Sequence, residues 1–172
     1  MASQYYYLIA SLPYLSLGGK EFISSGEFAA ECGKWLAPND LKVLEKIDAK
    51  NTGDKEIEPD TDDVVEQWKT FRQNLEEGLA AVRLAKRSPA KVRVPEMLTA
   101  VFEQGTPLAM EKSIERLKWD FAEQRESWYQ FDISWLFLYL LKVRVLERLA
   151  SFDRRKGEEA FQRLCEVDYD RE

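Results

Sequence analysis

Residues 132–152, with the sequence DISWLFLYLLKVRVLERLASF, decide the fold class of this chain. The first half of this stretch is apolar on every side, which predicts a helix buried on most of its faces. The second half is amphipathic, and Asp132 is placed to cap the helix. The apolar run 133–141 is nine residues long, whereas about 20 are needed to cross a bilayer. We therefore expect a protein that is not inserted in a membrane.

The segment 62–86 has the clearest helical pattern on the chain. Its apolar residues recur every three or four positions and form one stripe: Val64, Trp68, Phe71, Leu75, Leu79 and Val82. The pattern predicts a long amphipathic helix, with Arg72 and Arg83 on one flank of the stripe and Asn74 on the other.

Ser24 and Glu27 have the spacing of a capping box, which predicts a helix that buries Phe28, Cys32 and Trp35. This helix is predicted to span residues 26–36. Similar patterns predict further helices over 38–48, 95–102 and 108–129, and a last helix after Asp153 that carries Phe161 and Leu164. The chain is thus predicted to be all-α, a single-domain helical bundle of about seven helices over residues 1–172.

Three segments are less regular. Residues 4–12 contain three tyrosines and an isoleucine, residue types that favour a strand, whereas Ser3 is placed to cap a helix, so the sequence leaves both open. Residues 49–60 are polar and acidic and predict a surface loop. Residues 87–95 are basic and contain two prolines, which predicts a connection between helices.

The composition disfavours several classes of function. The 172 residues include 31 acidic and 25 basic side chains, which gives a net charge of −6, and no histidine. Without histidine, the usual general base near neutral pH and most zinc ligands are missing, so we expect no enzyme, no cofactor and no metal. The basic stretch 83–93 has no interleaved aromatic residues in an otherwise acidic chain, so we expect no binding of nucleic acid. Cys32 and Cys165 form no CxxC pair, and both are expected to be buried and reduced.

Lys142 falls on the apolar side of its predicted helix. Its long side chain is expected to snorkel to solvent. A buried ion pair, or a contact to a partner subunit, is the alternative. The tryptophans at positions 68, 119, 128 and 135 are expected to build the core, although aromatic residues are also enriched in interfaces.

Three parts of the chain together resemble an uncharacterised family of bacterial proteins encoded among the subunits of V-type ATPases. The first is the segment 5–15, YYYLIASLPYL, followed by Glu27 and Phe28. The second is the segment 68–75, WKTFRQNL, with Arg83 downstream. The third is the segment 135–148, WLFLYLLKVRVLER, which continues through Asp153 and the residues 156–159. The resemblance spans nearly the whole chain.

More distantly, the chain is similar to the C subunit of V/A-type ATPases, which is called subunit d in eukaryotic enzymes. That family is all-helical and forms a socket between the central rotor shaft and the membrane ring, without chemistry of its own. Asn74, Leu75 and Arg83 match the asparagine-leucine step and downstream arginine of its helices. This chain is much shorter than a C subunit.

The resemblance implies a non-enzymatic peripheral component of a bacterial V-type ATPase/ATP synthase, which takes part in proton or sodium translocation coupled to ATP. Its partners would be other subunits of the central stalk or membrane ring, with no small-molecule substrate. It would be cytoplasmic and peripheral to the inner membrane. The residues expected to contact partners are Tyr5, Tyr6, Tyr7, Arg72, Asn74, Arg83 and Lys142.

Two other hypotheses stay open on the sequence. One is a free-standing cytoplasmic helical adaptor or regulator, unconnected to the ATPase. The other is an enzyme that uses carboxylates or Lys142.

Overall fold

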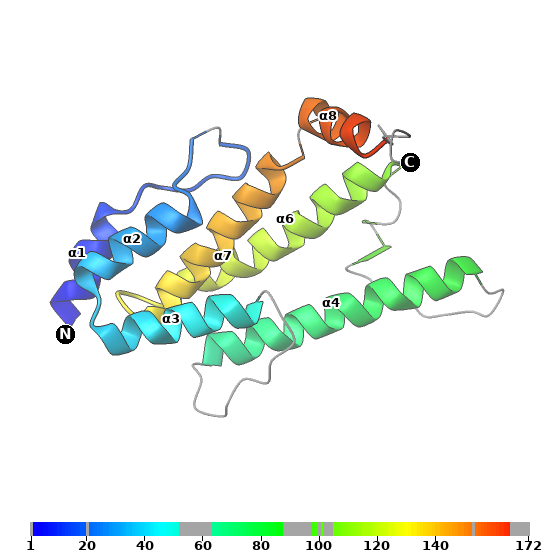
Figure 1. Cartoon of the computed structure of the whole chain (residues 1–172). Coiled ribbons are helices and arrows are strands. Elements are labelled where there is room, and N and C mark those ends of the chain that lie inside the picture. The colour runs from blue at the N-terminus through cyan, green and yellow to red at the C-terminus, as the bar shows by residue number, and fades with distance from the viewer. Residues whose placement is uncertain are drawn as a thin grey trace, which may run out of the picture.

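The computed structural model describes residues 2–19, 21–51, 63–87, 98–99, 101, 105–152 and 154–165. These residues form α-helices and no strand, which confirms the predicted all-α fold (Figure 1). The seven helices of the described residues are α1 (Ala2–Ser11), α2 (Ser25–Trp35), α3 (Pro38–Asn51), α4 (Asp63–Arg87), α6 (Pro107–Glu126), α7 (Ile133–Ala150) and α8 (Arg154–Cys165).

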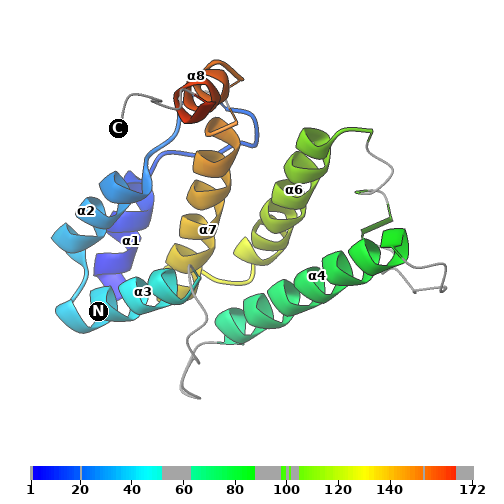
Figure 2. The same ribbon diagram turned by 45° about the vertical axis from the view of Figure 1, so that its right-hand side comes forward.

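Helix α7 lies at the centre of the fold. The backbone N–H of Trp135 donates to Asp132 at 2.8 Å, so Asp132 caps this helix as predicted. Helix α6 runs antiparallel alongside α7, and α2 and α3 contact α7 from other directions (Figures 1 and 2). Because it has neighbours on several sides, α7 buries an almost continuous run: Ser134, Leu136, Phe137, Leu138, Tyr139, Leu140, Leu141, Lys142, Val143, Val145 and Leu146.

The capping box at the start of α2 is confirmed. Ser24 Oγ accepts a hydrogen bond from the Glu27 N–H at 3.2 Å, and the Ser24 N–H donates to the Glu27 carboxylate at 2.8 Å. These hydrogen bonds from Ser24 lower the pKa of Glu27. The Ser25 N–H and hydroxyl both donate to Glu147 on α7, at 2.8 and 2.9 Å, and so fasten the start of α2 to the central helix.

Residues 4–12, which the sequence left open between strand and helix, belong to α1 and the turn after it. Leu8 of α1 is fully buried. The Tyr5 hydroxyl donates to Asp40 of α3 at 2.9 Å, and the Tyr139 hydroxyl donates to the Pro13 carbonyl at 2.7 Å. A helix pairs its own backbone N–H and C=O groups, whereas a strand needs a neighbouring strand for this. None of the described residues forms a strand that could pair with this segment, which is consistent with its being helical.

Helix α4 contributes to two cores. Near its start, Val64 and Trp68 join the main core, where the Trp68 ring lies 5.2 Å from that of Phe121 on α6. Further along, Leu75 packs with Leu98 and Val101 in a smaller second core. Figure 2 shows α4 standing apart from the α6–α7 pair, so large side chains rather than closely packed backbones connect them. In the predicted stripe, four members are buried, and Phe71 and Leu79 are half-buried.

Several expectations about burial are wrong. Trp35 is 38% exposed because it sits in the last turn of α2, where its ring stacks on that of Tyr7. Trp128 lies in the loop between α6 and α7 and is 68% exposed. Cys165 is exposed on α8, which extends beyond the end of α7 (Figure 1), whereas Cys32 is buried as expected.

The two predicted connections are only partly described. Helix α3 continues to Asn51, so it takes up the beginning of the loop predicted over 49–60. Arg87 is the last residue of α4 and the first of the connection predicted over 87–95. The other residues of both segments lie outside the described ranges.

Candidate functional site

The seven residues predicted to contact partners lie in three places. Tyr5, Tyr6 and Tyr7 are on α1, which carries no charged side chain. Arg72, Asn74 and Arg83 are on α4, and Lys142 is inside the core on α7. The structure therefore does not gather them into one site, and each group has different surroundings.

Four exposed aromatic side chains meet at one end of the molecule. We call Tyr6, Tyr7, Trp35 and Phe131 the aromatic patch; their exposed fractions are 51, 58, 38 and 43%. The Tyr6 ring lies 5.0 Å from that of Phe131 and 5.7 Å from that of Tyr7, and the Tyr7 ring stacks on Trp35 at 6.0 Å. Tyr5 is not part of it, because its side chain is half-buried and bonded to Asp40.

Phe131 joins the aromatic patch through an unusual backbone conformation. Its φ is +54°, in the left-handed region that bulky residues rarely adopt. Such a conformation costs on the order of 1–3 kcal/mol and persists only where the surrounding structure imposes it. The α6–α7 loop thus places the Phe131 ring against Tyr6 on α1. Trp35 and Phe131 were not predicted as site residues, because each is distant from Tyr6 and Tyr7 in the sequence.

A second feature is a groove of about 500 Å³ between α4, α6 and α7, which we call the arginine groove. Its apolar lining consists of Trp68, Leu75, Leu79, Ile114, Leu141 and Val145. Its cationic lining consists of Arg72, Arg83, Lys118, Arg144 and Arg148, and its acidic lining of Glu76, Glu111 and Glu115. The groove therefore carries more positive than negative side chains in a chain whose net charge is −6.

Some of these charges are paired within the chain. Arg72 lies 3.0 Å from Glu76, one turn further along α4. Lys118 lies 2.7 Å from Glu115 on α6, and Arg144 contacts Glu147 at 3.4 Å. Two of the predicted residues, Arg72 and Arg83, are thus brought to one groove, whereas Asn74 is exposed and is not among the described residues that line it.

Lys142 does not reach solvent, so the expectation that it snorkels is wrong. Its ammonium pairs with the Glu126 carboxylate at the end of α6 and lies 5.1 Å from the centre of the Trp119 ring. The alternative of a buried ion pair is confirmed.

A cavity of about 220 Å³ lies beside this pair, and Tyr139 also lines it. Burial of the hydroxyl, together with the charge of Glu126, raises the pKa of Tyr139. Among the described residues, no group of three or more His, Cys, Asp or Glu side chains is arranged to hold a metal ion. No helix within the described ranges combines the length and apolarity that a membrane span requires.

Residues 89–168 match the sequence model of a family described as proteins of unknown function, DUF2764. The matched range covers α6, α7 and α8, and it contains the third of the three segments that carry the resemblance, 135–159. It covers less than half of the chain and leaves out α1 and α4. No curated protein and no solved structure matches the chain.

Proposed function

We propose that this protein is a non-enzymatic peripheral component of a bacterial V-type ATPase/ATP synthase, similar to its C subunit. It acts through contacts with other subunits of the central stalk or membrane ring, and so contributes to proton or sodium translocation coupled to ATP. The proposal rests on the resemblance over 5–15, 68–83 and 135–159, and it places the protein in the cytoplasm, peripheral to the inner membrane.

The observation that supports a role through protein contacts is the aromatic patch. Tyr6 and Tyr7 stand on a helix without charged side chains, and more than half of each side chain is exposed. Large aromatic residues are enriched in interface hot spots, because they bury much area at a small cost in conformational entropy. Two tyrosines beside Trp35 and Phe131 give a surface on which a partner gains more free energy than on a charged helix face.

Affinity purification tests the proposal. The tagged full-length chain is expressed in its native host, the membranes are solubilised in mild detergent, and co-purified proteins are identified by mass spectrometry. V-type ATPase subunits are expected to co-purify with the native chain. Truncating a hot-spot residue costs about 2 kcal/mol or more, which is roughly 30-fold in affinity, so Tyr7→Ala should strongly reduce their recovery.

The matched control is Tyr14→Ala. Tyr14 is 89% exposed, but its ring is not in contact with the rings of the aromatic patch. Circular dichroism checks that both variants keep their helices. Recovery of no ATPase subunit with the native chain refutes the proposal and favours a free-standing adaptor. Equal losses with Tyr7→Ala and Tyr14→Ala refute the aromatic patch as the contact surface.

A further inference from the structure

The arginine groove offers a ligand its charged side chains rather than its apolar ones. Trp68, Leu141 and Val145 are buried in the main core, and Leu75 is buried in the second core. These apolar side chains pack against the chain itself and leave little surface for another molecule. A ligand in the groove therefore gains its binding free energy chiefly from the charged side chains that line it.

The charges of the groove favour an anion. Among the described residues that line it, five carry a positive charge and three a negative charge. Two of the three carboxylates are engaged, since Glu76 pairs with Arg72 at 3.0 Å and Glu115 pairs with Lys118 at 2.7 Å. The third, Glu111, is exposed, so water screens its charge. The excess of cations in a concave site attracts anions, although the whole chain has a net charge of −6.

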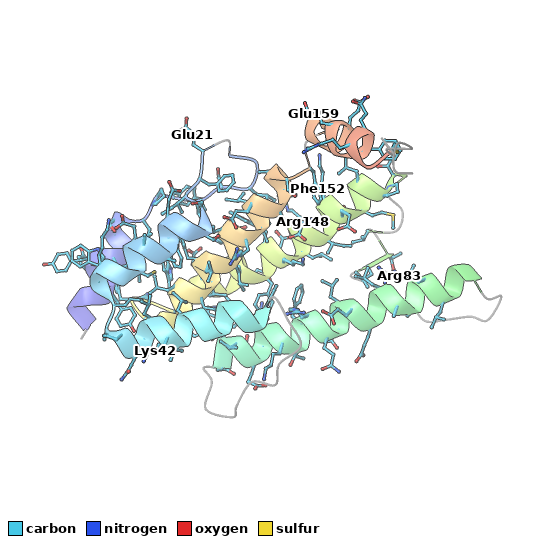
Figure 3. The ribbon with its side chains drawn as sticks, viewed as in Figure 1. Glu21, Lys42, Arg83, Arg148, Phe152 and Glu159 are labelled. Carbon is cyan, nitrogen blue, oxygen red and sulfur yellow. The ribbon has the colours of Figure 1, made fainter. Side chains whose placement is uncertain are left out.

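Two arginines of the groove are not neutralised by the described part of the chain. Arg83 is exposed, and no described carboxylate lies within ion-pair distance of it. The same is true of Arg148, whose guanidinium lies 4.8 Å from the centre of the Phe152 ring. Figure 3 shows Arg83 on α4 and Arg148 on α7. Because a guanidinium presents its N–H donors in a planar fork that matches the oxygens of a phosphoryl group, two helices supply donors for such a group.

A further donor is held in place on α6. The Lys118 ammonium donates to the Glu115 carboxylate at 2.7 Å, and the Glu115 side chain is only 5% exposed, so a poorly hydrated carboxylate fixes the position of the ammonium. An ammonium has three donors, and this hydrogen bond uses one of them. Lys118 is itself 30% exposed, so a ligand can reach it. The groove thus presents cations from all three of its helices.

We infer that the arginine groove binds a small soluble ligand that carries several phosphoryl groups, held by Arg83, Arg148 and Lys118. A single phosphoryl group can engage one wall of the groove, whereas a chain of such groups can reach cations on more than one helix. The volume of about 500 Å³ lies in the usual range of small-ligand sites. The inference goes beyond the proposed function, because it adds a ligand to a protein that acts through protein contacts, and it holds whether or not the partners belong to a V-type ATPase.

Isothermal titration calorimetry of the full-length chain tests this inference. The probe is sodium tripolyphosphate in metal-free buffer, and sodium sulfate at the same ionic strength represents a single oxyanion. Two further probes distinguish other sources of negative charge. Vesicles that contain phosphatidylglycerol present the phosphate of a lipid headgroup, and a short oligoglutamate peptide presents carboxylates. Each titration is carried out at low and at physiological salt.

The variants Arg83→Gln and Arg148→Gln each remove one charge from a different wall of the groove. Their matched control is Arg116→Gln on α6, because Arg116 is also an exposed arginine, pairs with Asp120 and is not among the described residues that line the groove. All three variants change the net charge equally, so an effect of overall charge moves them together. Circular dichroism and thermal melting check each fold, and Arg83→Gln alone carries the test if Arg148→Gln is unstable.

Tripolyphosphate is expected to bind at a single site with a Kd below about 0.1 mM, and less tightly as salt is raised. Sulfate should bind at least about tenfold more weakly, because it reaches fewer of the cations. Each groove variant should weaken the binding of tripolyphosphate about tenfold through the loss of charge-assisted hydrogen bonds, whereas Arg116→Gln should leave it within about twofold.

Four outcomes overturn the inference. The first is the absence of saturable binding of tripolyphosphate up to about 1 mM, or binding of sulfate that is equally tight. The second is an equal loss with Arg116→Gln, which assigns the binding to overall charge. The third is tighter binding of the oligoglutamate peptide than of tripolyphosphate, which assigns the groove to an acidic protein segment. The fourth is binding to phosphatidylglycerol vesicles that Arg83→Gln abolishes and tripolyphosphate does not displace, which assigns the groove to a lipid surface.

Discussion

The buried pair of Lys142 and Glu126 gives a quantitative test of the core, through a cycle of two single variants and one double variant. The two side chains differ in burial, because Lys142 is 5% exposed and Glu126 is 27% exposed. Breaking a buried ion pair by removing one partner costs about 3–5 kcal/mol, since the remaining charge is left without compensation in a poorly solvated place. The cost therefore depends on which charge remains.

Glu126→Met leaves the more deeply buried ammonium without its carboxylate. We expect it to lower the free energy of unfolding by about 3–4 kcal/mol, the contact with the Trp119 ring offsetting part of the loss. Lys142→Met leaves a carboxylate that water reaches in part, and should cost about 2 kcal/mol. For a chain of 172 residues, these values correspond to decreases in Tm of roughly 4–15 °C.

The double variant Lys142→Met, Glu126→Met removes both charges and replaces them with flexible apolar side chains. Replacing both members of a buried pair is often neutral, so the double variant should be more stable than either single variant. Urea unfolding followed by circular dichroism at 222 nm measures the three differences. The reasoning is refuted if the two single effects add within about 0.5 kcal/mol in the double variant, or if Lys142→Met costs more than Glu126→Met.

Four further predictions concern stability and reactivity. Cys165 should react with Ellman's reagent in the folded protein, whereas Cys32 should react only as the protein unfolds, because burial raises the pKa of its thiol to about 12. This pKa is above the ordinary value of 9.0, so the contribution of the neutral Cys32 thiol to the free energy of unfolding is complete below about pH 9 and is lost as the pH rises toward 12. Unfolding curves of the native chain and of Cys32→Ala, measured across this pH range, should show the loss in the native chain alone. Leu136→Ala should cost about 2–5 kcal/mol in urea unfolding, whereas Leu84→Ala, at a side chain that is 60% exposed, should cost less than about 0.5 kcal/mol. Ser24→Ala should lower the free energy of unfolding by about 1 kcal/mol through loss of the helix cap, and an unchanged Tm would contradict the role of the capping box.

Local signals in the sequence were sufficient to predict much of the fold. The capping box of Ser24 and Glu27 and the cap at Asp132 form as predicted, because each involves residues within one helical turn. The long helix predicted over 62–86 appears as α4, within a residue or so at each end, because its apolar period matches that of a helix. The same signals gave no answer for residues 4–12, where aromatic content and capping pointed to different structures.

The candidate surfaces could be predicted only in part. Tyr6 and Tyr7 were predicted to contact partners, but Phe131 was not, because it is brought to them by the path of the α6–α7 loop. Arg83 was placed beside an apolar stripe, whereas its position opposite Arg148 depends on how α4 sits against α7. The predicted burial of Cys165 is wrong for a similar reason. Its place in a helical pattern is typical of a core residue, but it lies on α8, where its side chain is exposed.

The sequence by itself determined that this chain is helical, where most of its helices begin and end, and that α7 is buried on most sides, because periodicity and caps are properties of neighbouring residues. The tertiary structure decided which side chains meet across helices. Lys142 is the clearest case, because its position on an apolar face was visible in the sequence. Its partner Glu126 lies on another helix, and only the packing of α6 against α7 turned an expected surface cation into an internal ion pair.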